Sequence, residues 1–543
     1  MSVLNDEELS RLQEITEKHL ETIVLEARPA EKVVIGMPTI FLQTFANVFA
    51  YYYLSERLSD KDLTFVFGGA SISYPQTITT FEKLKIDAYA IIGEGEKKLL
   101  RFVQKILAND NNLTDHDDGV FHVLSAPELF EWKKSWFNSQ IKSIKELPLP
   151  DFKEYFDYVS GVFVKDPANL PLVKNFELPL EGSRGCVFTC EFCNLNRFWM
   201  GYRKLPGEEI AERVKKLFEL YPSRRIRFVD NLCDGWAEQY ADILISENLK
   251  VHSFMELRPK HKNVFWKKLA ESGLKVGQLG TEGLDSKILG RVGKGTNVTD
   301  VIHATKALTE NDIILSANII TFYPNSTIEE TKNTDRHLKA LLHMPKFNLN
   351  RFWLGIDSPL YTKLMEDQKK DMKPSSRAAR SIPAKYENMN VFFYFESPED
   401  IGPTPDATIE WRKIRDWYEE ISPTYWLKHF LIVESDEQNG VVVFDRRFTD
   451  EVITHKLDRD TGIILEALHE GKSFEQLLVG SGLNKEVVTA LLNELLKKEL
   501  VLQIDQSFIG LPLRITRSEL KRRAEKKGVR IPEFTKAPAL LSV

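Results

Sequence analysis

Three of the four cysteines of this 543-residue chain lie within eight residues, in the sequence Cys186-Val-Phe-Thr-Cys190-Glu-Phe-Cys193. Thiolate is the ligand that iron–sulfur clusters usually take from proteins, and a 4Fe-4S cluster held by protein alone has four of them. Three cysteines at this spacing can therefore hold three irons of a cubane cluster. The fourth iron would then stay open to another ligand.

Other uses of clustered cysteines fit this loop less well. A structural zinc site needs four ligands, usually as two separated pairs, and no second pair or histidine pair completes this one. A disulfide would leave one of the three thiols over. Gly182, Gly185 and Asn194 flank the cysteines, which is not the pattern of a hydrophobic core. The triad therefore predicts an iron–sulfur site.

The spacing Cys-x-x-x-Cys-x-x-Cys, with the aromatic Phe192 before the last cysteine, resembles the signature of the radical S-adenosylmethionine (radical SAM) superfamily. The resemblance implies that Cys186, Cys190 and Cys193 bind a 4Fe-4S cluster whose open iron is chelated by SAM. It further implies that an electron, from a donor such as flavodoxin or ferredoxin, cleaves SAM to a 5'-deoxyadenosyl radical. That radical would abstract a hydrogen atom from the substrate.

The composition, with 43% hydrophobic and 28% charged residues, is typical of a globular protein of two to four domains. A net charge of -6 provides no basic field for nucleic acid, and the basic tail at 506–543 is expected to be a solvated helix. The sequence contains no apolar run of membrane-spanning length and no secretory signal. We therefore expect a cytoplasmic enzyme with no nucleic-acid or membrane partner.

Strand and helix patterns alternate over residues 1–110, with strands expected at 32–37, 64–67 and 88–92, which predicts an α/β domain. The order of these pieces resembles the second half of the cobalamin-binding domain that precedes many radical SAM enzymes. The domain would thus be a shortened Rossmann-like one. The resemblance implies a cobalamin site formed by residues at the strand ends, namely Thr39, Gln43, Gly68, Gly69, Gly93 and Glu94.

The family's domain normally begins with two further strands, which have no counterpart here. Three outcomes stay open for this reason. The sheet could bind cobalamin alone, bind it together with a partner chain, or serve only as a structural lid.

A connector at 111–175 leads to a second alternating region at 176–400. Strands are expected at 176–180, 224–229, 250–257, 275–279, 313–322 and 349–356, and the cysteine loop follows the first of them. Six such units predict a partial (β/α)6 barrel of the radical SAM type. Its active site is expected at the carboxyl ends of the strands.

Two polar residues near these strand ends are candidate SAM ligands. Glu282 lies in Gly280-Thr-Glu-Gly283, which resembles the Gly-x-Glu-Ser element of the family, with a glycine in place of the serine. The resemblance implies a contact between Glu282 and the SAM ribose or ammonium group. Asn318 lies within an apolar strand, where an unpaired amide would be costly, so we expect it to face SAM.

Four further residues have more than one possible role. Asp230 and Asn231 end the second strand, and either contact SAM or cap the following helix. Phe192 is expected by resemblance to face the adenine, or else to pack the loop onto the barrel. Cys233 is either a reactive thiol or a small buried residue.

Residues 401–435 are expected to link the barrel to a winged-helix-like domain at 436–505. A hairpin at 441–444 and 453–457 is followed by three helices that begin near 461, 473 and 484. This domain resembles the peptide-recognition domain of enzymes that modify ribosomally made peptides, which captures a leader peptide at a sheet edge. A dimerisation or capping role is the alternative.

The segments Leu284-Asp-Ser-Lys-Ile-Leu289 and Gly293-Lys-Gly295 look like the radical SAM subfamily that matures ribosomal peptides (RiPPs) beside a cobalamin domain. The leading hypothesis is thus a radical SAM enzyme that C-methylates a precursor peptide with cobalamin. The alternative reaction is cobalamin-independent cross-linking, epimerisation or oxidation. A hypothesis of another class is a peptide-binding partner in a maturation complex.

Overall fold

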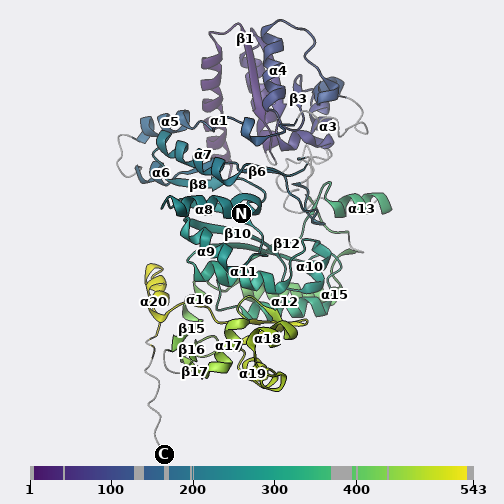
Figure 1. Cartoon of the computed structure of the whole chain (residues 1–543). Coiled ribbons are helices and arrows are strands. Elements are labelled where there is room, and N and C mark those ends of the chain that lie inside the picture. The colour runs from purple at the N-terminus through teal and green to yellow at the C-terminus, as the bar shows by residue number, and fades with distance from the viewer. Residues whose placement is uncertain are drawn as a thin grey trace, which may run out of the picture. The chain divides into compact units, whose positions relative to one another are not determined.

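The computed structural model describes residues 5–40, 43–126, 140–163, 170–195, 199, 201–368, 373, 394–398, 401–436, 440–532 and 534. The chain divides into two compact units. The first comprises residues 1–146, 194–201 and 353–396, and the second comprises residues 147–193, 202–352 and 397–543. Figure 1 labels their helices and strands. Among the described residues, no helix has the length and apolar character needed to cross a bilayer.

The first unit contains a four-stranded sheet in the order β1-β2-β3-β4. Strands β1 (Lys32–Pro38), β2 (Asp62–Gly68) and β3 (Tyr89–Ile91) are parallel, whereas β4 (Val120–His122) pairs antiparallel with β3. The three parallel strands confirm the predicted α/β arrangement. The sequence did not predict β4, which lies past residue 110.

Helices cover both faces of this sheet because the strands carry apolar side chains on both sides. Val33 and Met37 of β1 pack with α1 (Asp6–Ala27), α2 (Gln43–Arg57) and α3 (Pro75–Lys83), whereas Val34 lies in the core that contains α4 (Glu96–Leu107). Figure 1 shows α1 and α4 on either side of β1. Sheets covered in this way bind ligands at the carboxyl ends of their parallel strands.

The second unit contains the predicted partial barrel. Its six parallel strands lie in sequential order, and among the described strands β5 and β12 are the edges of the sheet. The strands are β5 (Glu177–Leu180), β8 (Arg225–Phe228), β9 (His252–Leu257), β10 (Leu274–Glu282), β11 (Ile314–Thr321) and β12 (Asn348–Arg351).

Helices connect each strand of the barrel to the next, and their fully buried side chains form its outer core. They are α7 (Gly207–Leu220), α8 (Asp234–Ser246), α9 (Asn263–Glu271), α10 (Ser286–Val292), α11 (Val298–Glu310) and α12 (Ile328–Ala340). The segment 401–435, expected to be a linker, contains α15 (Pro405–Glu419), whose Trp411 is fully buried.

We use the term C-terminal module for residues 431–526. An antiparallel sheet of β15 (Leu431–Asp436), β16 (Gly440–Asp445) and β17 (Ile453–Leu457) is followed by α17 (Arg459–Ala467), α18 (Phe474–Ser481) and α19 (Lys485–Lys497). A hairpin of β19 (Val501–Ile504) and β20 (Ser507–Gly510) precedes α20 (Arg517–Lys526). The predicted hairpin and three helices are therefore present.

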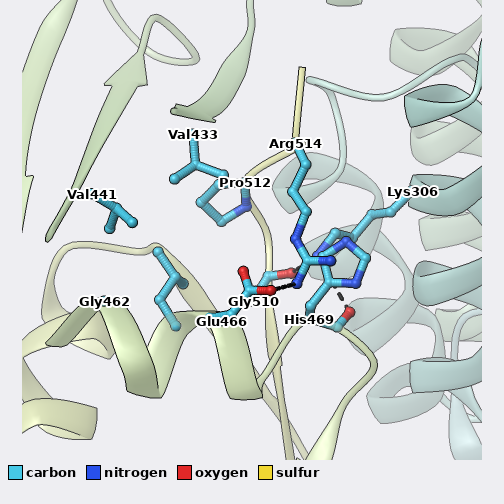
Figure 2. Close-up of a pocket in the computed structure, with 10 residues that line it drawn as sticks. Lys306, Val433, Val441, Gly462, Glu466, His469, Gly510, Pro512 and Arg514 are labelled. Atoms are coloured by element: carbon cyan, nitrogen blue, oxygen red, sulfur yellow. Dashed lines mark hydrogen bonds and ion pairs between the residues drawn. The ribbon is translucent and has the colours of Figure 1, made fainter. Parts of the chain in front are cut away.

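A buried polar cluster attaches this module to α11 of the barrel. The Lys306 ammonium donates to the carbonyl oxygens of Gly510 and, at 3.4 Å, of His469. The Glu310 carboxylate lies 3.0 Å from Nε2 of His469 and accepts the Arg514 N–H at 2.8 Å. Figure 2 shows Lys306, His469 and Arg514 gathered at this junction. We term Lys306, Glu310, His469 and Arg514 the docking cluster.

Candidate active site

The cysteine loop leaves the barrel through a short hairpin. Strand β6 (Ser183–Arg184) pairs with β7 (Arg203–Lys204), and Gly185 then turns the chain at a φ of 86°, a conformation that glycine adopts without strain. The loop is also fixed at its far end, because the Glu191 N–H donates to the carbonyl oxygen of Val292 at 3.0 Å. The cysteines therefore lie between the end of β5 and the end of α10.

Asp230 supports the base of this loop. Its carboxylate accepts hydrogen bonds from the Gly182 N–H at 3.0 Å, the Ser183 hydroxyl at 2.5 Å and the Trp236 indole at 3.1 Å. Burial nevertheless raises the pKa of Asp230 to about 7. These contacts give Asp230 a positioning role for the residues that lead into the triad. Its contact with SAM, and that of Asn231, stays a prediction.

The three cysteines are free thiols on one short loop, with Cys190 buried and Cys186 and Cys193 partly exposed. The Cys193 N–H donates to the carbonyl oxygen of Cys190 at 3.0 Å. Burial raises the pKa of Cys190 to about 11, whereas the nearby Lys294 ammonium opposes that rise.

Within the described residues, no three His, Cys, Asp or Glu side chains are placed to hold one metal ion. A cubane cluster does not require such convergence, because each of its thiolate ligands binds a different iron. Three thiols on one loop thus fit a cluster with three protein-bound irons and one iron open to another ligand.

Glu282 ends β10 in a backbone conformation that is rare for residues other than glycine. Its φ is 62°, and the register of β10 against β11 shifts between Leu279 and Glu282. The buried carboxylate lies 2.7 Å from the Lys294 ammonium. A strained residue that carries a buried charge at a strand end is typical of a functional site.

Asn318 lies beside Glu282 on the neighbouring strand. Ile319 is the register partner of Glu282, and the Thr281 hydroxyl donates to the carbonyl oxygen of Asn318 at 2.5 Å. The Asn318 side-chain oxygen accepts a hydrogen bond from Asn350 Nδ2 at 2.9 Å, so this amide is paired within the chain. A cavity of about 380 Å³ opens next to it, lined by Asn318, Lys346, Phe347, Asn348, Leu349, Asn350, Tyr418 and Glu419.

Three charged residues at the mouth of the barrel were not assigned a role from the sequence. The Arg258 guanidinium lies 3.7 Å from the centre of the Phe188 ring and donates to the carbonyl oxygen of Lys294. Glu256 lies on β9, which ends one residue before Arg258, and burial raises the pKa of the Glu256 carboxyl group. Lys294 stands between two glycines, which was the signal in the sequence that could have indicated its special position.

Phe192 and Cys233 occupy less informative positions. Phe192 is half-buried within the cysteine loop, and its contact with adenine stays a prediction. Cys233 is the N-cap residue of α8 and is fully buried, and burial raises the pKa of its thiol. Of the two alternatives for Cys233, this environment is that of a small core residue.

In the first unit, the residues expected at a cobalamin site gather at the carboxyl ends of β1 and β2. The Thr39 N–H donates to the carbonyl oxygen of Gly68 at 2.7 Å, which joins the two strand ends. Gly69 has a φ of 95°, and a Cβ there would lie 2.8 Å from the Thr39 carbonyl oxygen. Gln43 accepts the Ile40 N–H at 3.1 Å in the same loop.

The remaining two expected residues follow the end of β3. Gly93 has a φ of 74°, and the buried Glu94 carboxylate accepts the Ile141 N–H at 2.8 Å. Because β1, β2 and β3 are parallel, all six residues lie at one edge of the sheet. The structure thus brings together the expected residues, while their contact with cobalamin stays a prediction.

Residues 180–338 match the sequence model of the Radical SAM superfamily. The matched segment begins at the last residue of β5 and contains the cysteine loop, Glu282 and Asn318. The chain therefore contains a radical SAM domain, which is a domain that uses a 4Fe-4S cluster and SAM. Cys186, Cys190 and Cys193 are its predicted cluster ligands.

Curated relatives are more distant. The chain is 24% identical over 293 residues to an anaerobic magnesium-protoporphyrin IX monomethyl ester cyclase of Rubrivivax gelatinosus, a match that covers 51% of the chain and 48% of the relative. A cyclase of the same name from Cereibacter sphaeroides is 26% identical over 257 residues, with 45% and 39% covered. The chain thus spans about half the length of the curated relatives it matches, or less.

Solved structures show the same fold. The cobalamin-dependent S-adenosylmethionine radical enzyme OxsB with aqua-cobalamin and S-adenosylmethionine bound has a TM-score of 0.53 at 16% identity, covering 74% of this chain and 60% of OxsB. Apo OxsB has a TM-score of 0.52 at 15% identity, covering 94% and 76%. At these identities the similarity is one of fold.

Proposed function

We propose that this radical SAM enzyme modifies a ribosomally made precursor peptide, by C-methylation with cobalamin. One observation carries the proposal: the chain combines a radical SAM domain with a C-terminal module in which, among the described strands, β17 lies at an unpaired edge of its sheet. An electron donor such as flavodoxin or ferredoxin and a cytoplasmic location belong to the same proposal.

The open edge of the module is that of β17. In the sheet order β15-β16-β17, the outer side of β15 is bonded to the segment before α20, through Val433 N–H to Leu513 oxygen and Leu513 N–H to Leu431 oxygen, both at 2.9 Å. Among the described strands, β17 pairs only with β16. A peptide that adds a strand to this sheet would therefore bind along β17, where Ile453 is 46% exposed.

The barrel supplies the residues for the radical chemistry. Cys186, Cys190 and Cys193 would hold the cluster, and Glu282 and Asn318 would bind SAM. When bound and reduced, the cluster provides the electron that opens SAM to a radical. The half-buried Asn318 amide and the exposed Asn350 amide, beside the cavity that they line, are suited to hydrogen-bond a polar substrate such as a peptide backbone.

The sheet edge of the first unit fits a large group with many hydrogen-bonding atoms. Gly68 and Gly95 leave space after the parallel strands, since a Cβ at Gly68 would meet only the Ile91 carbonyl oxygen at 3.9 Å and a Cβ at Gly95 would meet no atom within 4 Å. Thr39 and Glu94 would be the side chains nearest to such a group. This is where cobalamin would bind.

The primary experiment is anaerobic reconstitution of the full chain with iron and sulfide, followed by SAM and a reductant. We expect about four irons per chain, release of 5'-deoxyadenosine, and bound cobalamin visible in the absorption spectrum. With SAM that carries a deuterated methyl group, a short peptide encoded beside the gene should gain the labelled methyl. If cobalamin in excess does not bind, the reaction is a cobalamin-independent modification instead.

The role of the C-terminal module is tested by peptide binding. Ile453→Glu places a charge on the open edge of β17 and should weaken binding of a fluorescent precursor peptide about tenfold, a loss of about 1.4 kcal/mol. Val479→Glu is the matched control, because Val479 lies on α18 of the same module and is 86% exposed. Equal affinities for the two variants and the wild type would remove peptide capture from this edge.

The curated relatives favour a second candidate function, cyclisation of magnesium-protoporphyrin IX monomethyl ester. It is tested by giving the reconstituted enzyme magnesium-protoporphyrin IX monomethyl ester. A SAM-dependent shift of the porphyrin absorption bands, without methyl transfer to any peptide, would support this candidate over the first.

A further inference from the structure

Glu282, the predicted ligand of SAM, is already paired with a cation of its own chain. The Lys294 ammonium lies 2.7 Å from Glu282 Oε1, and only 14% of the Lys294 side chain and 11% of the Glu282 side chain are exposed. A carboxylate in such a site needs a counter-charge, because burial without a partner is costly. Lys294 provides that charge.

The backbone around this pair is shaped to admit the lysine. A Cβ at Gly280 would lie 1.8 Å from Lys294 Nζ and 3.1 Å from Glu282 Oε1, so the ammonium occupies space that only a glycine leaves free. Lys294 itself stands between Gly293 and Gly295, whose φ angles are 73° and 69°. Two glycines in left-handed conformations give this short segment conformational freedom that other residues would not.

The Glu282 carboxylate has room for one cation at a time. Among the described residues, Lys294 is the cation that lies within hydrogen-bond distance of the Glu282 carboxylate, at 2.7 Å. The neighbouring Arg258 is committed elsewhere, to the Phe188 ring and to the carbonyl oxygen of Lys294. The Lys294 ammonium is therefore the direct counter-charge of Glu282, and a second cation at the same carboxylate would be repelled by it.

We propose that Lys294 is a built-in placeholder for the cationic part of SAM. Its ammonium neutralises Glu282 while SAM is absent, and it leaves Glu282 when the ammonium group of SAM binds there. This inference rests on the proposed contact between Glu282 and SAM. Its consequence is that part of the binding free energy of SAM is spent on breaking the Glu282–Lys294 pair.

The test is equilibrium dialysis of labelled SAM against the reconstituted enzyme with its cluster oxidised, so that no turnover occurs. Lys294→Met keeps the length of the side chain and removes the competing charge. It should bind SAM about tenfold more tightly than the wild type, which corresponds to loss of one partly buried ion pair. Lys294→Arg, which keeps the charge, should bind SAM with wild-type affinity.

Two further variants separate this effect from general ones. Glu282→Gln should weaken SAM binding, and adding Lys294→Met to it should bring no further change, because the pair no longer exists. Lys287→Met is the matched control, since it removes the exposed pair between Lys287 of α10 and Glu329 of α12 and should leave SAM affinity unchanged.

Unchanged or weaker SAM binding by Lys294→Met overturns the proposal, the weaker binding indicating that Lys294 contacts SAM directly. Iron content of each variant, measured on the same samples, shows whether the cluster site is intact. A wild type that holds four irons and binds SAM leaves the proposed function standing in either case. A wild type that does neither contradicts the proposed function itself.

Discussion

The mouth of the barrel and the docking cluster contain similar buried charges in very different states of pairing. In the docking cluster, Glu310 is bonded to His469 and to the Arg514 backbone, and Lys306 donates to two carbonyl oxygens. At the mouth, Glu282 forms an ion pair with Lys294, which lies between two glycines. Among the described residues, the Glu256 carboxylate has no hydrogen-bond partner. A buried carboxylate that several groups bond, such as Glu310, holds structure, whereas one without a hydrogen-bond partner, such as Glu256, is available to a ligand.

The largest expected effect is at the mouth. Cys190→Ala removes one of three iron ligands, so we expect loss of the cluster and a fall of SAM cleavage to background, with little change in unfolding. Iron analysis and 5'-deoxyadenosine release measure this. Cys233→Ala is the control, because Cys233 is fully buried outside the triad and should keep its irons. Activity of Cys190→Ala equal to that of the control would refute the cluster assignment.

The docking cluster should show the reverse behaviour. Glu310→Gln removes the charge that His469 and Arg514 share and should lower the free energy of unfolding by about 3 kcal/mol, the usual cost of breaking a buried polar pair. Chemical denaturation of the apoprotein measures it. Glu329→Gln, at an exposed pair with Lys287, should cost less than about 0.5 kcal/mol. SAM affinity of the folded reconstituted enzyme should be the same in both variants.

Local sequence patterns predicted the parts of the fold that local physics determines. The strands of the barrel follow apolar runs, and the capping boxes at Asn5 and Ser473 begin helices as expected. The strand β4 and the helix α15 were not predicted, because β4 has three residues and Trp411 of α15 is buried by contacts distant in sequence.

The candidate active site likewise has one part that the sequence predicted and another that it did not. The triad is a short-range pattern and was visible in the sequence, whereas the Glu282–Lys294 pair depends on how β10 ends and where α10 returns the chain. The docking cluster joins residues more than 150 positions apart, such as Glu310 and His469, and no spacing rule indicates it. Long-range polar pairs of this kind are set by tertiary packing.

A fall in pH should weaken the packing of the C-terminal module on the barrel before it affects the mouth of the barrel. Burial lowers the pKa of His303 to about 4 and of His343 to about 3, and His343 Nε2 lies 3.0 Å from the Leu511 carbonyl oxygen of the module. Because these folded-state pKa values lie below the unfolded value of 6.5, their contribution to stability is present above pH 6.5 and is lost as pH falls toward 4 and 3.

The loss at pH 5 should be roughly 2 kcal/mol for each of these histidines relative to pH 7.5. Denaturant titrations at the two pH values measure it. His343→Gln, which cannot be protonated, should show a pH dependence smaller by about that amount. An identical pH dependence in the variant and the wild type would mean that His343 does not contribute to the acid sensitivity.

The smallest expected effect is a stabilisation, and it tests the contrast between the mouth of the barrel and the docking cluster directly. Glu256→Gln removes a carboxyl group whose pKa is raised by burial and which forms no hydrogen bond within the described residues, so no bond is broken and a desolvation cost is relieved. The apoprotein should be stabilised by about 0.5 to 1 kcal/mol at pH 8, where Glu310→Gln is destabilising. Destabilisation by both substitutions would mean that the Glu256 carboxylate stabilises the fold, as Glu310 does, instead of being available to a ligand.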